Sequence, residues 1–219
     1  MNIPKTERLF YADEQRILKT IQAKKSKELE EQIKYHYFII FGASGIALTY
    51  LATIIKIGFL VFIFGTLAVF AYAFIVFMPY QFYKERKRIK TFLDELNSFI
   101  NKGTVNTHLI KAKRIALAKE YEDEGDLFII EYENDKVIYL WDYDYNLKKK
   151  FPCLDFEIYE DRFFKLLGRQ IYPLSKPIIP VLIDKKAKWN YMCKVGASAH
   201  LETENISFDK LIADYNSYI

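Results

Sequence analysis

Two long runs of uncharged, mostly apolar residues stand out in the pattern of hydrophobic and polar positions. The first extends from Tyr37 to Ile55 and the second from Ile57 to Tyr80, with Lys56 between them. A helix as long as the first run measures about 28 Å at about 1.5 Å per residue, close to the thickness of the hydrocarbon layer of a bilayer. The pattern therefore predicts two transmembrane helices within residues 37–82.

Lys56 indicates where the chain reverses. A lysine in the middle of a bilayer costs about 2.5–3.5 kcal/mol on insertion scales, whereas a lysine at a turn places its ammonium group among the lipid headgroups. Gly58 allows a left-handed helix cap close to it. A single helix from Tyr37 to Tyr80 would be too long for one crossing. We therefore expect a transmembrane helical hairpin with its tip at Lys56.

Small residues occur in both runs and favour close packing of the two helices. Gly42 and Gly45 in the first run are expected to meet Gly65 and Ala68 in the second, because small side chains allow helix backbones to approach in a membrane. The space between such helices is too small for the many phenylalanines of the second run. We expect the following rings to face lipid or a neighbouring subunit: Phe59, Phe62, Phe70, Phe74 and Phe77.

Basic residues flank the two runs and are scarce between them. They are Lys24, Lys25, Lys27 and Lys34 before the first run, and Lys84, Arg86, Lys87, Arg88 and Lys90 after the second. Because cytoplasmic loops carry an excess of Lys and Arg, we expect both termini in the cytoplasm and the protein in the inner (cytoplasmic) membrane. The N-terminal residues carry no secretory signal pattern, and two distant cysteines fit a reducing compartment.

The segments that flank the runs are charged but carry apolar positions at helical spacing. Residues 1–36 are expected to form a cytosolic N-terminal helix that leads into the first crossing. Residues 83–104 carry an apolar stripe that stops at Gly103, a residue type common at helix ends. Together they predict a two-helix cytosolic stalk, and the alternative is a juxtamembrane helix whose basic residues lie on anionic lipid.

Residues 105–219 are long enough to bury their own core and predict a small α+β cytosolic domain. A β-hairpin is expected where two β-branched and aromatic runs flank a short polar turn. The expected elements are a helix over 108–121, strands over 127–133, 136–141 and 153–160, a short helix over 161–168, an edge strand over 178–184 and a helix over 208–219.

Acidic residues gather around Gly125 in the segment EYEDEGD, residues 120–126. The weak catalytic candidates are Glu122, Asp123 and Asp126, together with Glu131 on the next strand. Carboxylates of this kind could bind a divalent metal for phosphodiester hydrolysis. The alternatives are a solvated helix end or a contact with a partner, and the spacing alone does not decide between them.

Lysines alternate with aromatic residues in two later segments. The candidate ligand-binding residues are Lys148, Lys149, Lys150, Lys185, Lys186, Lys188, Trp189 and Tyr191. Such a surface could stack a base and hold phosphates. A membrane-facing or simply solvated surface would show the same composition.

Two further acidic patterns do not predict a metal site. The segment Asp142–Asn146 begins like a calcium loop, but Leu147 stands where the loop needs glycine and Cys153 where it needs glutamate. His200, Glu202 and Glu204 alternate along one short stretch, an arrangement that is not specific for any metal. No glycine-rich phosphate loop or known catalytic motif occurs, so we expect no cofactor.

These observations predict a two-pass membrane-anchored sensor or effector that acts through oligomerised transmembrane helices and perturbs the membrane. Its cytosolic domain would bind a ligand, for example a nucleotide, or a cytosolic protein. The layout resembles that of membrane effectors of bacterial signalling and antiphage systems, an architectural likeness only. The expected partners are the lipid bilayer and further copies of the chain. The alternatives are a membrane-tethered metal-dependent hydrolase and a non-catalytic anchor subunit of a larger complex.

Overall fold

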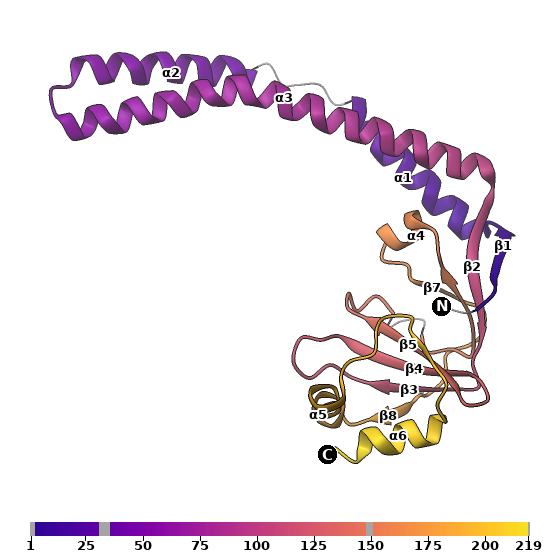
Figure 1. Cartoon of the computed structure of the whole chain (residues 1–219). Helices are drawn as coiled ribbons and strands as arrows, with labels where there is room; N and C mark the ends of the chain where they lie inside the picture. The colour runs from indigo at the N-terminus through magenta and orange to yellow at the C-terminus, as the bar shows by residue number, and fades with distance from the viewer. Residues whose placement is uncertain (1–2, 31–35, 148–150, 219) are drawn as a thin grey trace. The chain divides into compact units, whose positions relative to one another are not determined.

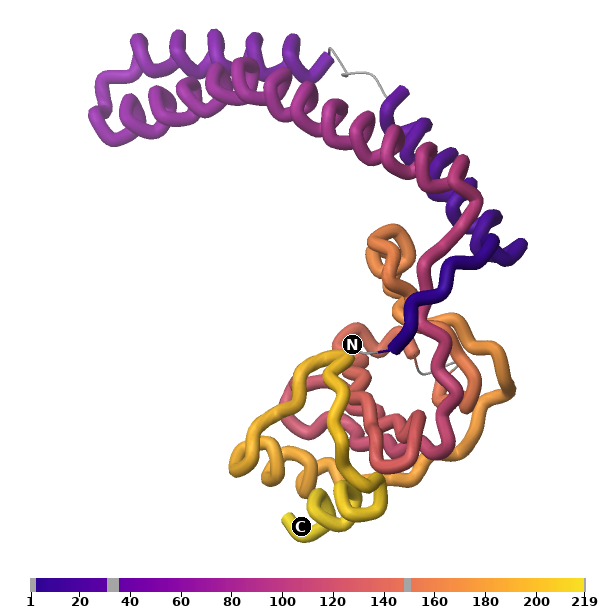
Figure 2. Tube along the Cα trace, turned by 45° about the vertical axis from the view of Figure 1, so that its right-hand side comes forward, coloured from indigo at the N-terminus to yellow at the C-terminus, as the bar shows by residue number. Residues whose placement is uncertain are grey.

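The computed structural model describes residues 3–30, 36–147 and 151–218, and it divides the chain into two compact units. The helical unit is Tyr11–Gly103, and the sheet unit joins Met1–Phe10 to Thr104–Ile219. The chain therefore starts in the sheet unit, runs through the helical unit and returns to the sheet unit (Figures 1 and 2). The sequence did not predict that Lys5–Leu9 forms a strand of a sheet.

Two antiparallel helices form a hairpin, α2 (His36–Ile54) and α3 (Gly58–Lys102) (Figure 1). Both are long and apolar enough to cross a membrane, and only 6% and 11% of their most apolar 18-residue windows are buried. Lys56 lies exposed in the short connection between them, where the sequence predicted the reversal. Gly58 instead begins α3 and does not have a positive φ, so the left-handed cap predicted there is not formed.

The hairpin is packed most closely at Gly45. A Cβ atom built on Gly45 would lie 2.9 Å from the ring of Tyr72, and one on Gly42 would lie 3.8 Å from Ile75. The hydroxyls of Thr49 and Tyr72 share a hydrogen bond of 3.3 Å beside this approach. The absence of a side chain at Gly45 therefore makes room for the tyrosine ring.

Ala68 and Gly65, two of the small residues predicted to pack between the helices, differ in their surroundings. Ala68 is buried, with 4% of its surface exposed, whereas a Cβ atom on Gly65 would meet no atom within 4 Å. The close approach is therefore made at Gly45 and not at Gly65. Phe74 stacks on Phe41 with 4.0 Å between ring centroids, so it is not one of the outward-facing rings. The other four phenylalanines are exposed: Phe59, Phe62, Phe70 and Phe77.

The second half of α3 pairs with the preceding helix, α1 (Ala12–Glu30). The side-chain amide of Gln22 donates to Asn97 Oδ1 at 2.6 Å, and Arg86 donates to the carbonyl of Leu29 at 3.0 Å. These bonds join residues far apart in sequence, and they agree with the predicted pairing of the two charged helices.

Helix α3 continues without a break from its apolar part into its charged part. Pro79 lies inside the helix, and the helix ends at Gly103, as the sequence predicted. Gly103 has a φ of 73° and its N–H donates to the carbonyl of Ile100 at 3.1 Å. Such a left-handed cap satisfies a carbonyl that the last helical turn leaves unpaired.

The first sheet of the sheet unit has four strands in the order β1-β2-β6-β7, each antiparallel to its neighbour. Its strands are β1 (Lys5–Leu9), β2 (Thr104–Lys111), β6 (Asp155–Tyr159) and β7 (Ile171–Pro173). A short helix, α4 (Arg162–Leu166), connects β6 to β7.

The second sheet has five strands in the order β8-β3-β4-β5-β9. Its strands are β3 (Arg114–Ala118), β4 (Asp126–Glu133), β5 (Lys136–Asp142), β8 (Val181–Ile183) and β9 (Thr203–Glu204). Only the pair β3–β8 is parallel. Two further helices, α5 (Lys185–Val195) and α6 (Phe208–Asn216), complete the unit (Figure 1).

Two apolar cores lie on opposite faces of the five-stranded sheet. Phe128 and Ile130 point into a core shared with β2 and β6, whereas Leu127 and Ile129 point into a core shared with α5 and α6. Successive side chains of a strand face opposite sides, so a strand buried on both faces needs apolar residues at every position. This double burial explains why β4 reads as a continuous apolar run.

The predicted strands over 127–133, 136–141 and 153–160 are confirmed as β4, β5 and β6, and the edge strand over 178–184 as β8. The short and the C-terminal helices are confirmed as α4 and α6. The predicted helix over 108–121 is wrong, because this segment forms the end of β2 and all of β3. Its leucines, alanines and lysines favour a helix, but pairing with β6 and β4 on both sides overrides that local preference.

Candidate functional site

The acidic segment 120–126 and the lysine-rich helix α5 form one site. Lys188 is completely buried, and its Nζ atom lies 2.7 Å from Glu124 Oε1 and donates to the carbonyl of Gly125 at 2.9 Å. The same atom lies 5.5 Å from the centre of the Trp141 ring. The acidic and basic segments are far apart in the sequence, and the structure brings them together.

The local geometry explains how each partner is held. Asp184 caps α5 by accepting hydrogen bonds from the backbone N–H groups of Lys186 and Ala187 at 2.9 and 3.0 Å. The Glu124 carboxylate accepts from the N–H groups of Tyr121 and Glu122 at 3.0 and 2.6 Å. Both ends of the ion pair are therefore fixed by backbone hydrogen bonds.

The charges of this pair perturb each other's pKa. Burial alone would raise the pKa of Glu124, but hydrogen bonds from Lys188 and from the backbone hold it below its usual value. Burial lowers the pKa of Lys188, and the negative charges of Glu124, Asp126 and Glu120 oppose that shift. The pair holds α5 on the sheet, which gives these two residues a structural role.

The remaining catalytic candidates do not converge. Asp126 accepts a hydrogen bond from the backbone N–H of Glu120 at 2.9 Å at one end of β4. At the other end, Glu131 lies 2.7 Å from the side chain of Arg114, which also binds Asp209 at 2.6 Å. Asp126 and Glu131 are five positions apart along an extended strand, so their Cα atoms lie roughly 17 Å apart.

Glu122 and Asp123 are exposed on the loop before β4. Across residues 3–30, 36–147 and 151–218, no group of three or more His, Cys, Asp or Glu side chains is placed to hold a metal ion. The four acidic residues expected to bind a divalent metal are therefore not gathered at one place.

The other acidic patterns are also occupied by local contacts. Asp142 is buried and accepts from the backbone N–H groups of Asn146 and Leu147 at 3.0 and 3.1 Å, so it closes a turn. The side chain of His200 accepts from the N–H of Trp141 at 3.1 Å. Glu202 and Glu204 each bind other groups: the N–H of Ala199 donates to the first, and the hydroxyl of Tyr139 to the second.

The predicted ligand residues on α5 divide into buried and exposed members. Lys188 forms an ion pair with Glu124, and the ring of Tyr191 stacks on Tyr215 with 4.1 Å between centroids. Lys185 and Lys186 are exposed, and Trp189 is partly buried, 6.5 Å from the ring of Tyr121. Three further predicted residues, Lys148, Lys149 and Lys150, lie outside the described residues.

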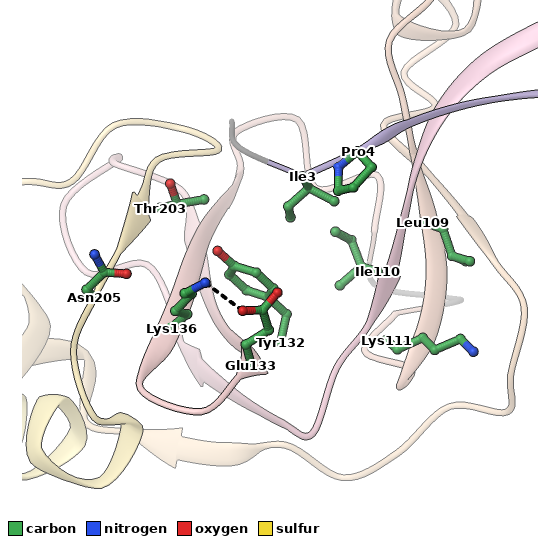
Figure 3. A pocket seen from close by; sticks show the side chains of 10 residues that line it. All are labelled: Ile3, Pro4, Leu109, Ile110, Lys111, Tyr132, Glu133, Lys136, Thr203 and Asn205. Carbon is green, nitrogen blue, oxygen red and sulfur yellow. Dashed lines mark hydrogen bonds and ion pairs between the residues drawn. The ribbon is translucent and has the colours of Figure 1, made fainter.

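A cleft that the sequence did not reveal lies elsewhere in the sheet unit (Figure 3). It has a volume of about 480 Å³, within the range of about 300–1,000 Å³ typical of small-molecule sites. Its walls come from the segment before β1, from β2, from the β4–β5 hairpin and from the β9 region. The lining residues are Ile3, Pro4, Leu109, Ile110, Lys111, Tyr132, Glu133, Lys136, Thr203 and Asn205.

The cleft combines apolar and polar walls. Ile3 and Tyr132 pack against the core between the two sheets, and Lys136 Nζ lies 2.6 Å from Glu133 Oε2 at the mouth. Burial raises the pKa of Tyr132 above its ordinary value. No short sequence motif could have indicated this cleft, because its walls come from residues as far apart along the chain as Ile3 and Asn205.

Comparisons of the chain with protein-family models, with curated proteins and with solved structures found no match.

Proposed function

We propose that this protein is a two-pass membrane-anchored sensor or effector of the cytoplasmic membrane. In this proposal α2 and the apolar part of α3 cross the bilayer, both termini lie in the cytoplasm, and the sheet unit binds a ligand or a cytosolic protein. Further copies of the chain would associate through their hairpins and transmit the bound state to the membrane.

The observation that carries the proposal is the exposure of an apolar hairpin. Phe59 and Phe62 are 73% and 72% exposed, and the apolar windows of both helices are almost entirely unburied. The core helix of a soluble protein would bury such a face within its own chain. In α3, residues 58–77 include 13 Leu, Ile, Phe and Val residues, which together favour insertion by roughly 4–8 kcal/mol at about 0.3–0.6 kcal/mol each.

The charge distribution supports the orientation in this proposal. The basic side chains of α1 and of the charged part of α3 lie at the ends of the apolar segments that are away from the tip. The tip itself carries only one basic residue, Lys56. Lysine and arginine near the ends of membrane helices are retained in the cytoplasm. The exposed phenylalanines of α3 offer a surface for lipid or for a neighbouring hairpin, because rings of this size on one side of a hairpin need an apolar environment.

The native cysteines make a direct test of the topology. Cys193 is exposed on α5 and Cys153 is fully buried, so an impermeant maleimide reports on Cys193 alone. In spheroplasts of a bacterial expression host, Cys193 should be labelled only after permeabilisation. A cysteine at the tip, in the variant Lys56→Cys with Cys193→Ser, should be labelled in intact spheroplasts.

Three results would overturn separate parts of the proposal. Release of the chain from membranes by alkaline carbonate would show that the hairpin is not inserted. Labelling of Cys193 in intact spheroplasts, with the chain retained in the membrane, would reverse the orientation. If cross-linking showed that the chain is monomeric in membranes, the proposed association through the hairpins would be wrong.

A further inference from the structure

Contacts within the chain hold the walls of the cleft of Figure 3 in place. The imidazole Nδ1 atom of His108 lies 2.9 Å from the carbonyl oxygen of Ile3, and this hydrogen bond fixes the segment that forms the upper wall. Ile3 also packs against the core between the sheets, and Ile110, which lines the same cleft, is only 1% exposed. Rigid walls reduce the entropy lost when a ligand is bound.

One side of the cleft suits a flat apolar group. Figure 3 shows the ring of Tyr132 below Ile3 and Pro4, with Ile110 pointing toward the same space. A tyrosine ring opposite aliphatic side chains can hold a planar ring between them, and aromatic side chains stack on bases in this way in nucleic-acid complexes.

The other side of the cleft offers a cation and free polar groups. Lys136 is 44% exposed and its partner Glu133 is 58% exposed. An ion pair this exposed adds little to stability, because water screens the two charges, so an anionic ligand can replace the Glu133 carboxylate at little cost. In the described part of the chain, the side chains of Thr203 and Asn205 form no hydrogen bonds, so both remain available to a ligand.

A second hollow of similar size is less suited to an anion. It has a volume of about 490 Å³ and lies beside Asp126, with Glu120 and Lys119 also in its wall. Two carboxylates against one lysine repel a negative ligand. The cleft of Figure 3 has the opposite balance, with Lys111 and Lys136 against Glu133.

We propose that the cleft of Figure 3 binds a small planar organic anion of mononucleotide size. The ring lies between Tyr132 and the Ile3–Pro4 segment, the anionic group binds Lys136, and the polar edge of the ring bonds Thr203 and Asn205. This inference rests on the ligand-binding part of the proposed function and is independent of the membrane anchor. It places the ligand in the cleft and not on α5.

The test uses the full chain in nanodiscs of zwitterionic phosphatidylcholine and four probes. The probes are adenosine monophosphate, adenosine, phenyl phosphate and inorganic phosphate, with binding measured by equilibrium dialysis. Adenosine monophosphate should bind at least about tenfold more tightly than adenosine or inorganic phosphate. Adenosine lacks the anionic group, and inorganic phosphate lacks the planar ring. Phenyl phosphate should fall between them.

Two variants assign the binding to the cleft. Lys136→Gln should weaken the binding of adenosine monophosphate about tenfold and leave the binding of adenosine unchanged. Tyr132→Leu should weaken the binding of both adenosine monophosphate and adenosine and leave the binding of inorganic phosphate unchanged. Lys186→Gln, an exposed lysine of α5, is the matched control and should change nothing. The same unfolding midpoint for all three variants would show that the fold is intact.

Several results would overturn the inference. The first is that adenosine monophosphate binds no more tightly than inorganic phosphate, and the second is that no probe binds. The third is that Lys186→Gln weakens the binding of adenosine monophosphate and Lys136→Gln does not, which would place the site on α5. Membrane insertion is measured separately by carbonate extraction. A chain that is inserted but binds no probe therefore removes the cleft proposal alone.

Discussion

The variant Lys188→Met is expected to destabilise the sheet unit strongly. Lys188 is completely buried and pairs with Glu124 at 2.7 Å, and the Glu124 side chain is 11% exposed. Methionine retains most of the volume beside Trp141 but removes the charge, which leaves the carboxylate without its counter-charge. Breaking one side of a buried ion pair costs about 3–5 kcal/mol. Because Glu124 keeps two backbone hydrogen bonds, we expect a loss of about 3 kcal/mol.

The chain carries its own probe for this measurement. Its two tryptophans, Trp141 and Trp189, both lie in the sheet unit, so tryptophan fluorescence follows the unfolding of this unit in the full chain. Urea titrations in nanodiscs would give the free energy of unfolding. The control Lys186→Gln removes an exposed lysine of the same helix and should change stability by less than about 0.5 kcal/mol.

A double-mutant cycle separates the ion pair from simple loss of packing. Glu124→Gln leaves the Lys188 ammonium buried without its counter-charge and should also destabilise the unit. The double variant removes both charges, so it should cost less than the sum of the two single variants by about 1–3 kcal/mol. An unfolding midpoint of Lys188→Met equal to that of the wild type, or costs that simply add, would refute the reasoning.

The pH dependence of stability independently tests whether the charge of Glu124 stabilises the folded chain. The pKa of Glu124 is lower in the folded chain than its ordinary value of 4.5. A depressed carboxyl pKa stabilises the folded state above the unfolded-state pKa, and this contribution is lost as the pH falls through the folded-state pKa. The difference in stability between the wild type and Glu124→Gln should therefore be constant from pH 6 to 8 and should shrink below about pH 4.5.

Two further predictions concern the hairpin and α5. Gly45→Val should loosen the hairpin because its side chain would overlap the Tyr72 ring, whereas Gly65→Val, at a site with no atom within 4 Å, should not. Hydrogen exchange of α2 measured by mass spectrometry compares them, and equal exchange would contradict the predicted packing. Asp184→Ala should lower the stability of the sheet unit by about 1 kcal/mol and Asp184→Ser should restore most of it, because serine can also cap a helix; equal urea midpoints for both would contradict this role.

The elements predicted correctly are those whose periodicity is long or whose turn chemistry is specific. The two apolar helices follow from uninterrupted runs, and the β4–β5 hairpin follows from apolar runs on either side of Asn134 and Asp135. Asp135 adopts a positive φ of 56°, which a polar turn residue tolerates better than most others. These signals are local, so the sequence alone carries them.

The errors have a common physical cause. The segment 108–121 has the composition of a helix, and only its strand partners, β6 and β4, determine its extended form. The pair of Glu124 and Lys188, and the cleft, join residues more than 60 positions apart. Contacts of this kind depend on the tertiary fold, so residue type and spacing identified the charged groups but not their partners.

The two connections between the helical unit and the sheet unit leave the sheet at adjacent points. Leu9 at the end of β1 is the register partner of Thr104 at the start of β2, and Gly103 alone separates β2 from α3. A pulling force on α1 and α3 would therefore enter the domain through one pair of strands. The ladder between β1 and β2 is then the first element under mechanical load, and its rupture would free the N-terminal strand before either core opened.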